Sequence, residues 1–217
     1  LPVVCNEVLW SLAVSVYSVI MGHMALSTPI LAAYTIAGNI DRLLNVGLFA
    51  AGGATAVIIG RDIGRRVDDD TLYGRGVALN FLCLATGLVS AGLILLTRAF
   101  LCDGFIFPVM NISDQAGRIA KYMLLIVAAA MPVRACNLCN VVGVFRGGSD
   151  VRFGLYVDVL PMYLLTVPAS AVAALLLGCG IGVVYPIMCS DELFKTFMCV
   201  PHLRTRKWIH NVTRDNI

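Results

Sequence analysis

Six long apolar runs limit what this chain can fold into more than any other feature of its sequence. They lie at about 2–22, 30–60, 77–97, 119–144, 153–177 and 180–200. Each is long enough for one transmembrane helix, because roughly 20 predominantly apolar residues cross the hydrocarbon layer. None shows the alternating segments of about ten residues that membrane β-strands require. The sequence therefore predicts an all-α, polytopic membrane protein that forms a bundle of six transmembrane helices.

The composition excludes a water-soluble domain of this size. Of the 217 residues, 59% are hydrophobic and only 13% are charged, whereas about a quarter of a soluble domain is charged. The excess of 16 Lys and Arg over 13 Asp and Glu is small and scattered, which argues against a nucleic-acid surface. We expect the lipid bilayer as a partner and no nucleic acid.

Basic residues between the runs predict the orientation of the chain. Ten Lys and Arg fall in three segments that a six-helix path places on one side: 61–75, 145–152 and 201–217. Only three lie on the other side. The positive-inside rule then puts both termini in the cytoplasm, for a multi-pass protein of the plasma membrane. Since no linker divides the chain, we expect residues 1–217 to form a single membrane lobe, with 201–217 as a basic cytoplasmic tail.

The sequence holds no motif of a nucleotide-binding, hydrolytic or zinc-dependent enzyme. A Cys136-x-x-Cys139 pair lies in an apolar run, but the three histidines fall at run ends or in the tail. This is a poor metal site. We therefore expect no enzyme, no bound metal and no cofactor, with the cysteines as buried free thiols.

Glu7 is an ionisable group inside the first apolar run. Inserting such a group into the membrane costs about 3 kcal/mol on insertion scales. We therefore expect it to contact a partner residue or water, or to have a functional role. Ser11, Ser15 and Ser18 follow at helical spacing and place four polar side chains on one stripe. The stripe predicts a face that borders a cavity or a neighbouring helix. The alternative is that Glu7 reaches interfacial water.

Asp158 is a second carboxylate at a comparable position. It lies about five residues into the fifth run, which crosses in the same direction as the first, so Asp158 and Glu7 are expected at similar depth. Buried carboxylates of this kind suit a proton or sodium carrier. The alternative is an interfacial Asp158 paired with Arg152 or Arg134. Arg134, near the middle of the fourth run, is in turn a candidate counter-ion for Glu7 or Asp158.

A polar seam is predicted along the second run. Two overlapping helical stripes form it: Tyr34, Gly38, Arg42 and Asn45, and Thr35, Asn39 and Arg42. Asp41 and Arg42 cannot face each other on a helix, and an interfacial position is the favoured interpretation for both. Glu192 and Lys195, three residues apart, predict a local structural pair. The candidates for lining a substrate cleft are Ser11, Tyr34, Asn39, Arg134 and Asn137.

Several stretches, in this order, resemble the second half of multidrug and toxic compound extrusion (MATE) transporters: LPVVCNEVLWSLAVSVYSVIMGHM, LAAYTIAGNIDRLLNVGLFAAGGATAVIIGRDIG, FRGGSDVRFGLYVD, and DELFK followed by RTRKWIHN. They cover nearly the whole chain. One departure is ALSTPI, which follows His23-Met24 where such proteins have a short turn. We therefore expect the first outer loop to differ from that of the family.

The resemblance implies helices seven to twelve of a twelve-helix protein with two six-helix lobes, so that the N-terminal lobe is a missing partner. It also implies an antiporter that expels amphipathic organic cations or drugs in exchange for Na⁺ or H⁺, through a cleft between the lobes. Glu7 matches the acidic residue that the family uses for cation coupling in this lobe. Asp158 is our choice for the second, and Asp150 in the RGGSD turn is expected to cap a hairpin.

Two other functions are compatible with the sequence. One is a truncated membrane fragment that does not transport. The other is a lipid-precursor flippase, which would need more basic residues facing the cleft than Arg134 and Arg42 provide.

Overall fold

Each apolar run becomes helical because a helix satisfies its backbone hydrogen bonds internally, where lipid offers none. The computed structural model describes residues 2–210, and this range contains helices and no strand, which confirms the all-α class. The α-helices are α1 (Pro2–Gly22), α2 (Ser27–Gly64), α3 (Asp69–Leu96), α4 (Phe107–Val109), α5 (Asp114–Leu138), α6 (Val151–Pro161), α7 (Val167–Ala171), α8 (Ile181–Met188) and α9 (Asp191–Thr205). Four π-helical segments continue them: η1 (Thr97–Ile106), η2 (Cys139–Phe145), η3 (Met162–Thr166) and η4 (Val172–Leu176).

The described chain crosses the bundle six times. Five passes are continuous helices, apolar and long enough to span a membrane: Val3–Gly22, Ser27–Gly64, Asp69–Val109, Asp114–Phe145 and Val151–Leu176. The second is longer than the predicted run at 30–60 and is unbroken. Its 38 residues extend about 57 Å, well beyond the hydrocarbon thickness.

The sixth pass differs from the prediction of one helix at 180–200. It consists of α8 and α9, which are separated at Cys189 and Ser190. Pro186 inside α8 has no N–H, and the carbonyl of Gly182, four residues earlier, accepts a hydrogen bond from Tyr122 Oη at 2.8 Å. α9 then begins with Asp191 and Glu192 in its first turn, where the helix dipole favours carboxylates.

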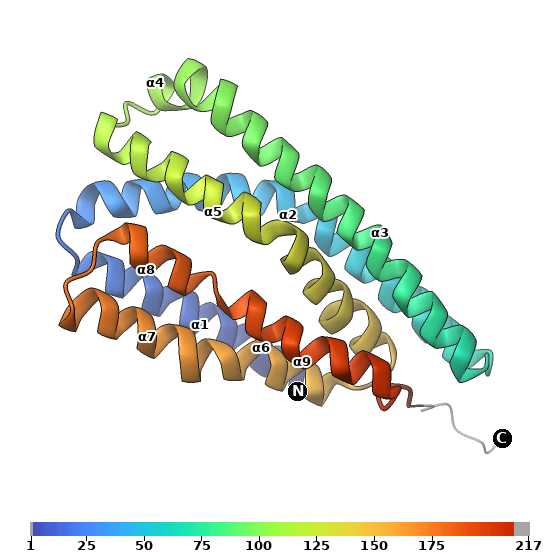
Figure 1. The fold of residues 1–217 in the computed structure, drawn as a ribbon. Helices are drawn as coiled ribbons and strands as arrows, with labels where there is room; N and C mark the ends of the chain where they lie inside the picture. The colour runs from blue at the N-terminus through green and yellow to red at the C-terminus, as the bar shows by residue number, and fades with distance from the viewer. Residues whose placement is uncertain (1, 211–217) are drawn as a thin grey trace.

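The helices form two groups (Figure 1). α2, α3 and α5 contact one another in one group, and α1, α6, α7, α8 and α9 make up the other. Both described chain ends lie at the end of the bundle where α2 turns into α3, and α4 and the α7–α8 connection lie at the opposite end. We call the first the basic end, because the predicted basic segments 61–75 and 145–152 and the described part of 201–217 meet there.

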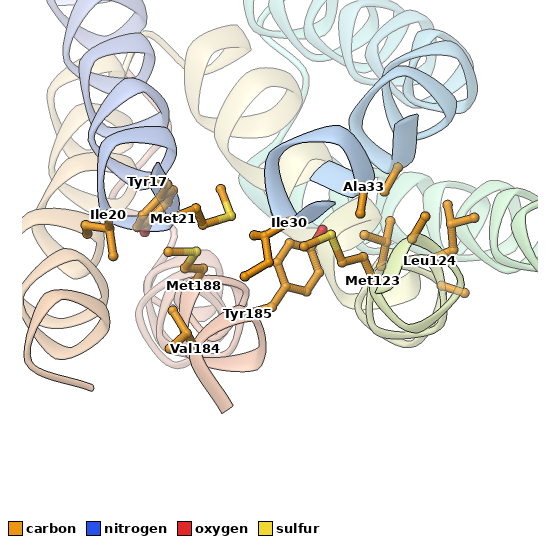
Figure 2. Packing of buried hydrophobic residues seen from close by; sticks show 14 of the residues in the cluster. Tyr17, Ile20, Met21, Ile30, Ala33, Met123, Leu124, Val184, Tyr185 and Met188 are labelled. Atoms are coloured by element: carbon orange, nitrogen blue, oxygen red, sulfur yellow. The ribbon is translucent and has the colours of Figure 1, made fainter. Parts of the chain in front are cut away.

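An apolar core joins the two groups near the opposite end (Figure 2). We define it by ten residues, none more than 6% exposed: Tyr17, Ile20, Met21, Ile30, Ala33, Met123, Leu124, Val184, Tyr185 and Met188. They come from α1, α2, α5 and α8. The flexible methionine side chains suit the irregular space between four converging helices.

The predicted tail at 201–217 is partly folded. Residues 201–205 complete α9, and Trp208 is fully buried and donates through Nε1 to the Leu203 carbonyl at 3.1 Å. Trp208 lies so close to Gly148 that a Cβ there would collide with it. Residues 211–217 lie outside the described range. Asp150 caps α6 by accepting from the Phe153 N–H at 3.3 Å, as predicted.

Candidate functional site

A cavity of about 550 Å³ lies between the two helix groups, beside the apolar core. Its exposed lining residues all belong to α1 and α2: Glu7, Trp10, Thr35, Asn39, Arg42 and Phe49. The lining residues that α8 and α9 contribute are buried. The cavity therefore opens between α1 and α2, and α8 and α9 form its floor.

Arg134 of α5 connects three helices across the cavity. Its Nη1 donates to both carboxylate oxygens of Asp41 on α2, each at 2.9 Å. Its Nε lies 3.4 Å from Oε1 of Glu192 on α9. The side chains of Arg134 and Asp41 are only 22% and 21% exposed. Because a partly buried charge without a partner is costly, this geometry holds α2, α5 and α9 together.

Lys195 is the second cation of the cavity floor. Its Nζ lies 3.1 Å from Asp191 Oδ2, 4.0 Å from Glu192 Oε1 and 3.4 Å from Asp158 Oδ1. The first two carboxylates are on its own helix, and Asp158 is on α6. We call these six residues the buried ion network: Asp41, Arg134, Asp158, Asp191, Glu192 and Lys195.

Three amide side chains border this network. Asn137 Nδ2 donates to the Glu192 carbonyl at 2.7 Å and to Glu192 Oε2 at 2.9 Å. Asn45 donates to Asp41 Oδ1 at 2.8 Å, and Asn6 donates to Asp158 Oδ2 at 3.0 Å. The Oδ1 atoms of Asn6 and Asn45 are buried and have no hydrogen-bond partner among the described residues. An unmade buried hydrogen bond costs about 1–3 kcal/mol, so both atoms are open to a ligand or a proton donor.

Glu7 lies at the rim of the cavity rather than in the network. Its side chain is 59% exposed, and its Oε1 lies 3.1 Å from Nη2 of Arg146. Ser11 and Ser15 are exposed and hydrogen-bond to carbonyls of their own helix, at 2.7 Å and 2.9 Å. Neither serine lines the cavity. Of the predicted stripe, Glu7 and Ser18 do.

The cavity brings together six of the seven residues proposed from the sequence as coupling or cleft-lining residues. These are Glu7, Asp158, Tyr34, Asn39, Arg134 and Asn137. Ser11 lies on the exposed side of α1 and does not line this cavity, and its role in a cleft stays a prediction. In lipid both faces of a helix can be apolar, so spacing alone did not tell which face of α1 looks into the protein.

Two predicted pairings are wrong. Arg134 is a counter-ion of Asp41 and Glu192, and within residues 2–210 it forms no ion pair with Glu7 or Asp158. Asp158 pairs with Lys195 instead of Arg152 or Arg134. Asp41 lines the cavity and pairs there with Arg134, and the interfacial position expected for Asp41 and Arg42 stays a prediction.

The sequence reasoning gave no role to Asn6 and Asp191, and assigned Lys195 only a local one. Helical spacing offered one signal for Asn6, because Ala13, Tyr17 and Ile20 lie on the same side of α1 and are buried with it. A second signal was the pairing of Asp191 with Lys195, which are four residues apart. The contact between Lys195 and Asp158 joins helices that are remote in sequence, so helical spacing could not predict it.

The cavity carries a mixed but net negative charge. Five carboxylates line it, together with the cationic groups of Arg42, Arg134, Arg146 and Lys195. Aromatic side chains line it as well: Trp10, Tyr17, Tyr34, Phe49 and Tyr185. Tyr34 and Tyr185 meet edge to face with ring centres 6.4 Å apart. Carboxylates and aromatic faces both attract cations, so the chemistry of the lining suits a positively charged amphipathic molecule.

Among the described residues, no group of three or more His, Cys, Asp or Glu side chains has the geometry to hold a metal ion. The eight cysteines, all within the described range, are free thiols. Comparisons with curated proteins and with solved structures each found no match. A family model does match: MatE, over residues 2–172. Five membrane-length apolar helices and a match across most of the chain make this protein a member of the MatE family of membrane transporters.

Proposed function

We propose that the chain forms one lobe of a two-lobed, cation-coupled antiporter of the plasma membrane. The transporter exports amphipathic organic cations, including drugs, in exchange for Na⁺ or H⁺. The observation that carries this proposal is the cavity itself, which combines excess carboxylate, aromatic walls and a mouth between α1 and α2. A second, N-terminal six-helix lobe would cover that mouth and complete the cleft.

Glu7 and Asp158 are the proposed coupling residues. Both line the cavity, and both sit beside a cation that neutralises them, Arg146 for Glu7 and Lys195 for Asp158. The coupling ion would compete with these contacts. Glu7 is accessible from the mouth, whereas Asp158 is only 17% exposed, so the two carboxylates sample the cavity at different depths.

The lining argues against the lipid-precursor flippase. Of the four cationic side chains in the cavity, Arg134, Arg146 and Lys195 already pair with carboxylates. This leaves Arg42 to meet an anionic headgroup, which is too little free positive charge for a phosphate-rich substrate.

Transport by the isolated chain tests the two-lobe proposal. In cells, this chain alone should not lower the accumulation of a fluorescent lipophilic cation, and co-expression with a matching N-terminal lobe should restore export. Robust export by the demonstrably monomeric chain would contradict the proposal. Failure of every matched pair of lobes, with both present in the membrane, would favour the non-transporting fragment.

Coupling is tested in the two-lobed protein reconstituted in liposomes. Glu7→Gln keeps the shape but can neither release a proton nor offer a full negative charge to Na⁺. It should abolish gradient-driven export while substrate binding persists. Asp158→Asn should weaken coupling by the same route. Val19→Ala is the matched control on α1, since Val19 is exposed and does not line the cavity. Unchanged coupling in Glu7→Gln would remove Glu7 from the mechanism.

A further inference from the structure

Lys195 is the most enclosed cation of the cavity. Its side chain is 7% exposed, compared with 22% for Arg134 and 23% for Arg146. Three carboxylates lie within 4.0 Å of its Nζ. An ammonium group on a four-carbon stem has rotatable donors, so it can move among such partners more freely than a planar guanidinium.

The partners of Lys195 are of two kinds. Asp191 and Glu192 are tied to Lys195 through the same helix, and Asp191 is the nearest at 3.1 Å. Asp158 comes from α6, and in the described part of the chain Lys195 is the one cation that forms an ion pair with it. Lys195 can therefore leave Asp158 and still be neutralised by Asp191 and Glu192.

Asn6 provides an independent sign that the place beside Asp158 accepts a ligand. This side chain is 5% exposed, and its Nδ2 donates to Asp158 Oδ2 at 3.0 Å. The Oδ1 atom of the same amide is buried without a hydrogen-bond partner. Because Nδ2 and Oδ1 belong to one small planar group, an unused acceptor lies next to a carboxylate whose counter-ion among the described residues, Lys195, has two further carboxylate partners. A proton on Asp158 or a bound Na⁺ would contact both the Asp158 carboxylate and the Oδ1 atom of Asn6.

We propose that Lys195 is a tethered counter-ion that holds the place of the coupling cation at Asp158. With no cation bound, Nζ neutralises Asp158. When a proton or Na⁺ binds Asp158, Lys195 withdraws to Asp191 and Glu192. This inference rests on the proposed cation-coupled antiport and adds a device that sets the affinity of its cation site.

The other charged and titratable groups around Lys195 do not supply the same competition. They are Tyr17 of α1, Arg134 of α5, and Cys199 of α9 itself. Arg134 is engaged by Asp41 and reaches Lys195 only through Glu192. A tyrosine or a thiol is neutral at physiological pH. The positive charge that opposes cation binding at Asp158 thus comes from Lys195.

The test is a titration of the full chain in lipid nanodiscs, with infrared difference spectra to report protonated carboxylic acids. Asp158→Asn identifies the Asp158 signal. In Lys195→Met that signal should show its midpoint about 1 to 3 pH units higher than in the parent, a tenfold to thousandfold gain in proton affinity, because a neighbouring cation is lost. Lys195→Arg keeps the charge and should shift the midpoint less than half as much.

Lys121→Met is the matched control, because Lys121 pairs with Asp103 at the opposite end of the bundle. It should leave the Asp158 midpoint where it is in the parent. If Lys195→Met does not fold, Lys195→Met/Asp191→Asn restores the charge balance and should show the same upward shift. An unchanged midpoint in a folded variant lacking Lys195 would overturn the proposal.

A transport assay in the two-lobed protein separates this proposal from the proposed function. Na⁺ is titrated at fixed pH, and pH is varied without Na⁺. Lys195→Met should lower the half-saturating concentration of the coupling ion about tenfold or more. In an Asp158→Asn background, Lys195→Met should not change the half-saturating concentration. If the role of Lys195 were only structural, the substitution would still change it there. An infrared shift without coupled export by the parent would support the counter-ion and overturn the antiport.

Discussion

The apolar core and the buried ion network share α2 and α5 and are held together by opposite chemistry. In the core, α1, α2, α5 and α8 meet through side chains such as Met21, Ile30 and Met123, which are at most 2% exposed. Toward the basic end, α2, α5, α6 and α9 meet through ion pairs around Arg134 and Lys195. One bundle therefore carries a closed apolar contact and an open charged chamber side by side.

The difference between the two regions shows which contacts between helices lipid can replace. Lipid tails are as apolar as a leucine side chain, so a helix gains little by exchanging lipid for another apolar surface. The core is held by close packing. A charge in the cavity has no comparable substitute, because neither lipid nor a helix backbone can replace its partner. We expect the ion network to contribute more stability per residue than the core.

The largest loss of unfolding free energy is expected for a substitution of Arg134. Arg134→Leu leaves Asp41 and Glu192 without their shared cation. Removing one partner of a buried ion pair costs about 3 to 5 kcal/mol. The free energy of unfolding in bicelles, measured by denaturant titration, should fall by this amount. A loss below about 1 kcal/mol would remove the contrast with the core, since exposed pairs already reach that value.

A smaller loss is expected in the apolar core. Met123→Ala opens a cavity at a fully buried position between α5 and α2. In soluble proteins such changes cost about 2 to 5 kcal/mol. Here we expect about 2 kcal/mol, because the transfer contribution is small when lipid is the alternative solvent. Met110→Ala, at an exposed position, is the matched control and should change the stability little. A cost above that of Arg134→Leu would reverse the comparison.

A polar contact outside the cavity should matter less. Asp68 caps α3 at the basic end, where the Thr71 N–H donates to it at 2.9 Å and Thr71 Oγ1 at 2.8 Å. These hydrogen bonds hold the pKa of Asp68 below its ordinary value. The stabilisation is therefore present above the unfolded pKa and is lost as the pH falls through the lower, folded one. Asp68→Ala should destabilise the chain slightly at pH 7, and the difference from the parent should vanish in strong acid.

The smallest effect is expected for an exposed ion pair near the opposite end. Lys121 pairs with Asp103, and these side chains are 28% and 61% exposed. Exposed pairs contribute roughly 0 to 1 kcal/mol. Lys121→Met should change the unfolding free energy by less than about 0.5 kcal/mol. A loss as large as that of Arg134→Leu would show that charge itself, and not burial in the cavity, distinguishes the two regions.

The contrast also explains how much of the site could be predicted from sequence. Glu7, Asp158 and Arg134 stand out because a charge inside an apolar run is costly wherever it lies. The partners of these residues do not stand out, because Arg134 meets Asp41 and Glu192 across 93 and 58 positions of sequence. Only the packing of α2, α5 and α9 decides those pairs.

The sequence alone determined the membrane environment, the all-α class, the paths of five spans and the clustering of basic loops at one end. Each follows from a local free-energy cost. In lipid every backbone polar group must be hydrogen-bonded within the protein, and a run of about 20 apolar residues matches the thickness of the hydrocarbon layer. The tertiary structure decided that the sixth pass breaks at Cys189 and Ser190, that Ser11 faces outward, and that Lys195 reaches Asp158. These depend on which helix faces meet, and in lipid the apolar pattern does not specify that.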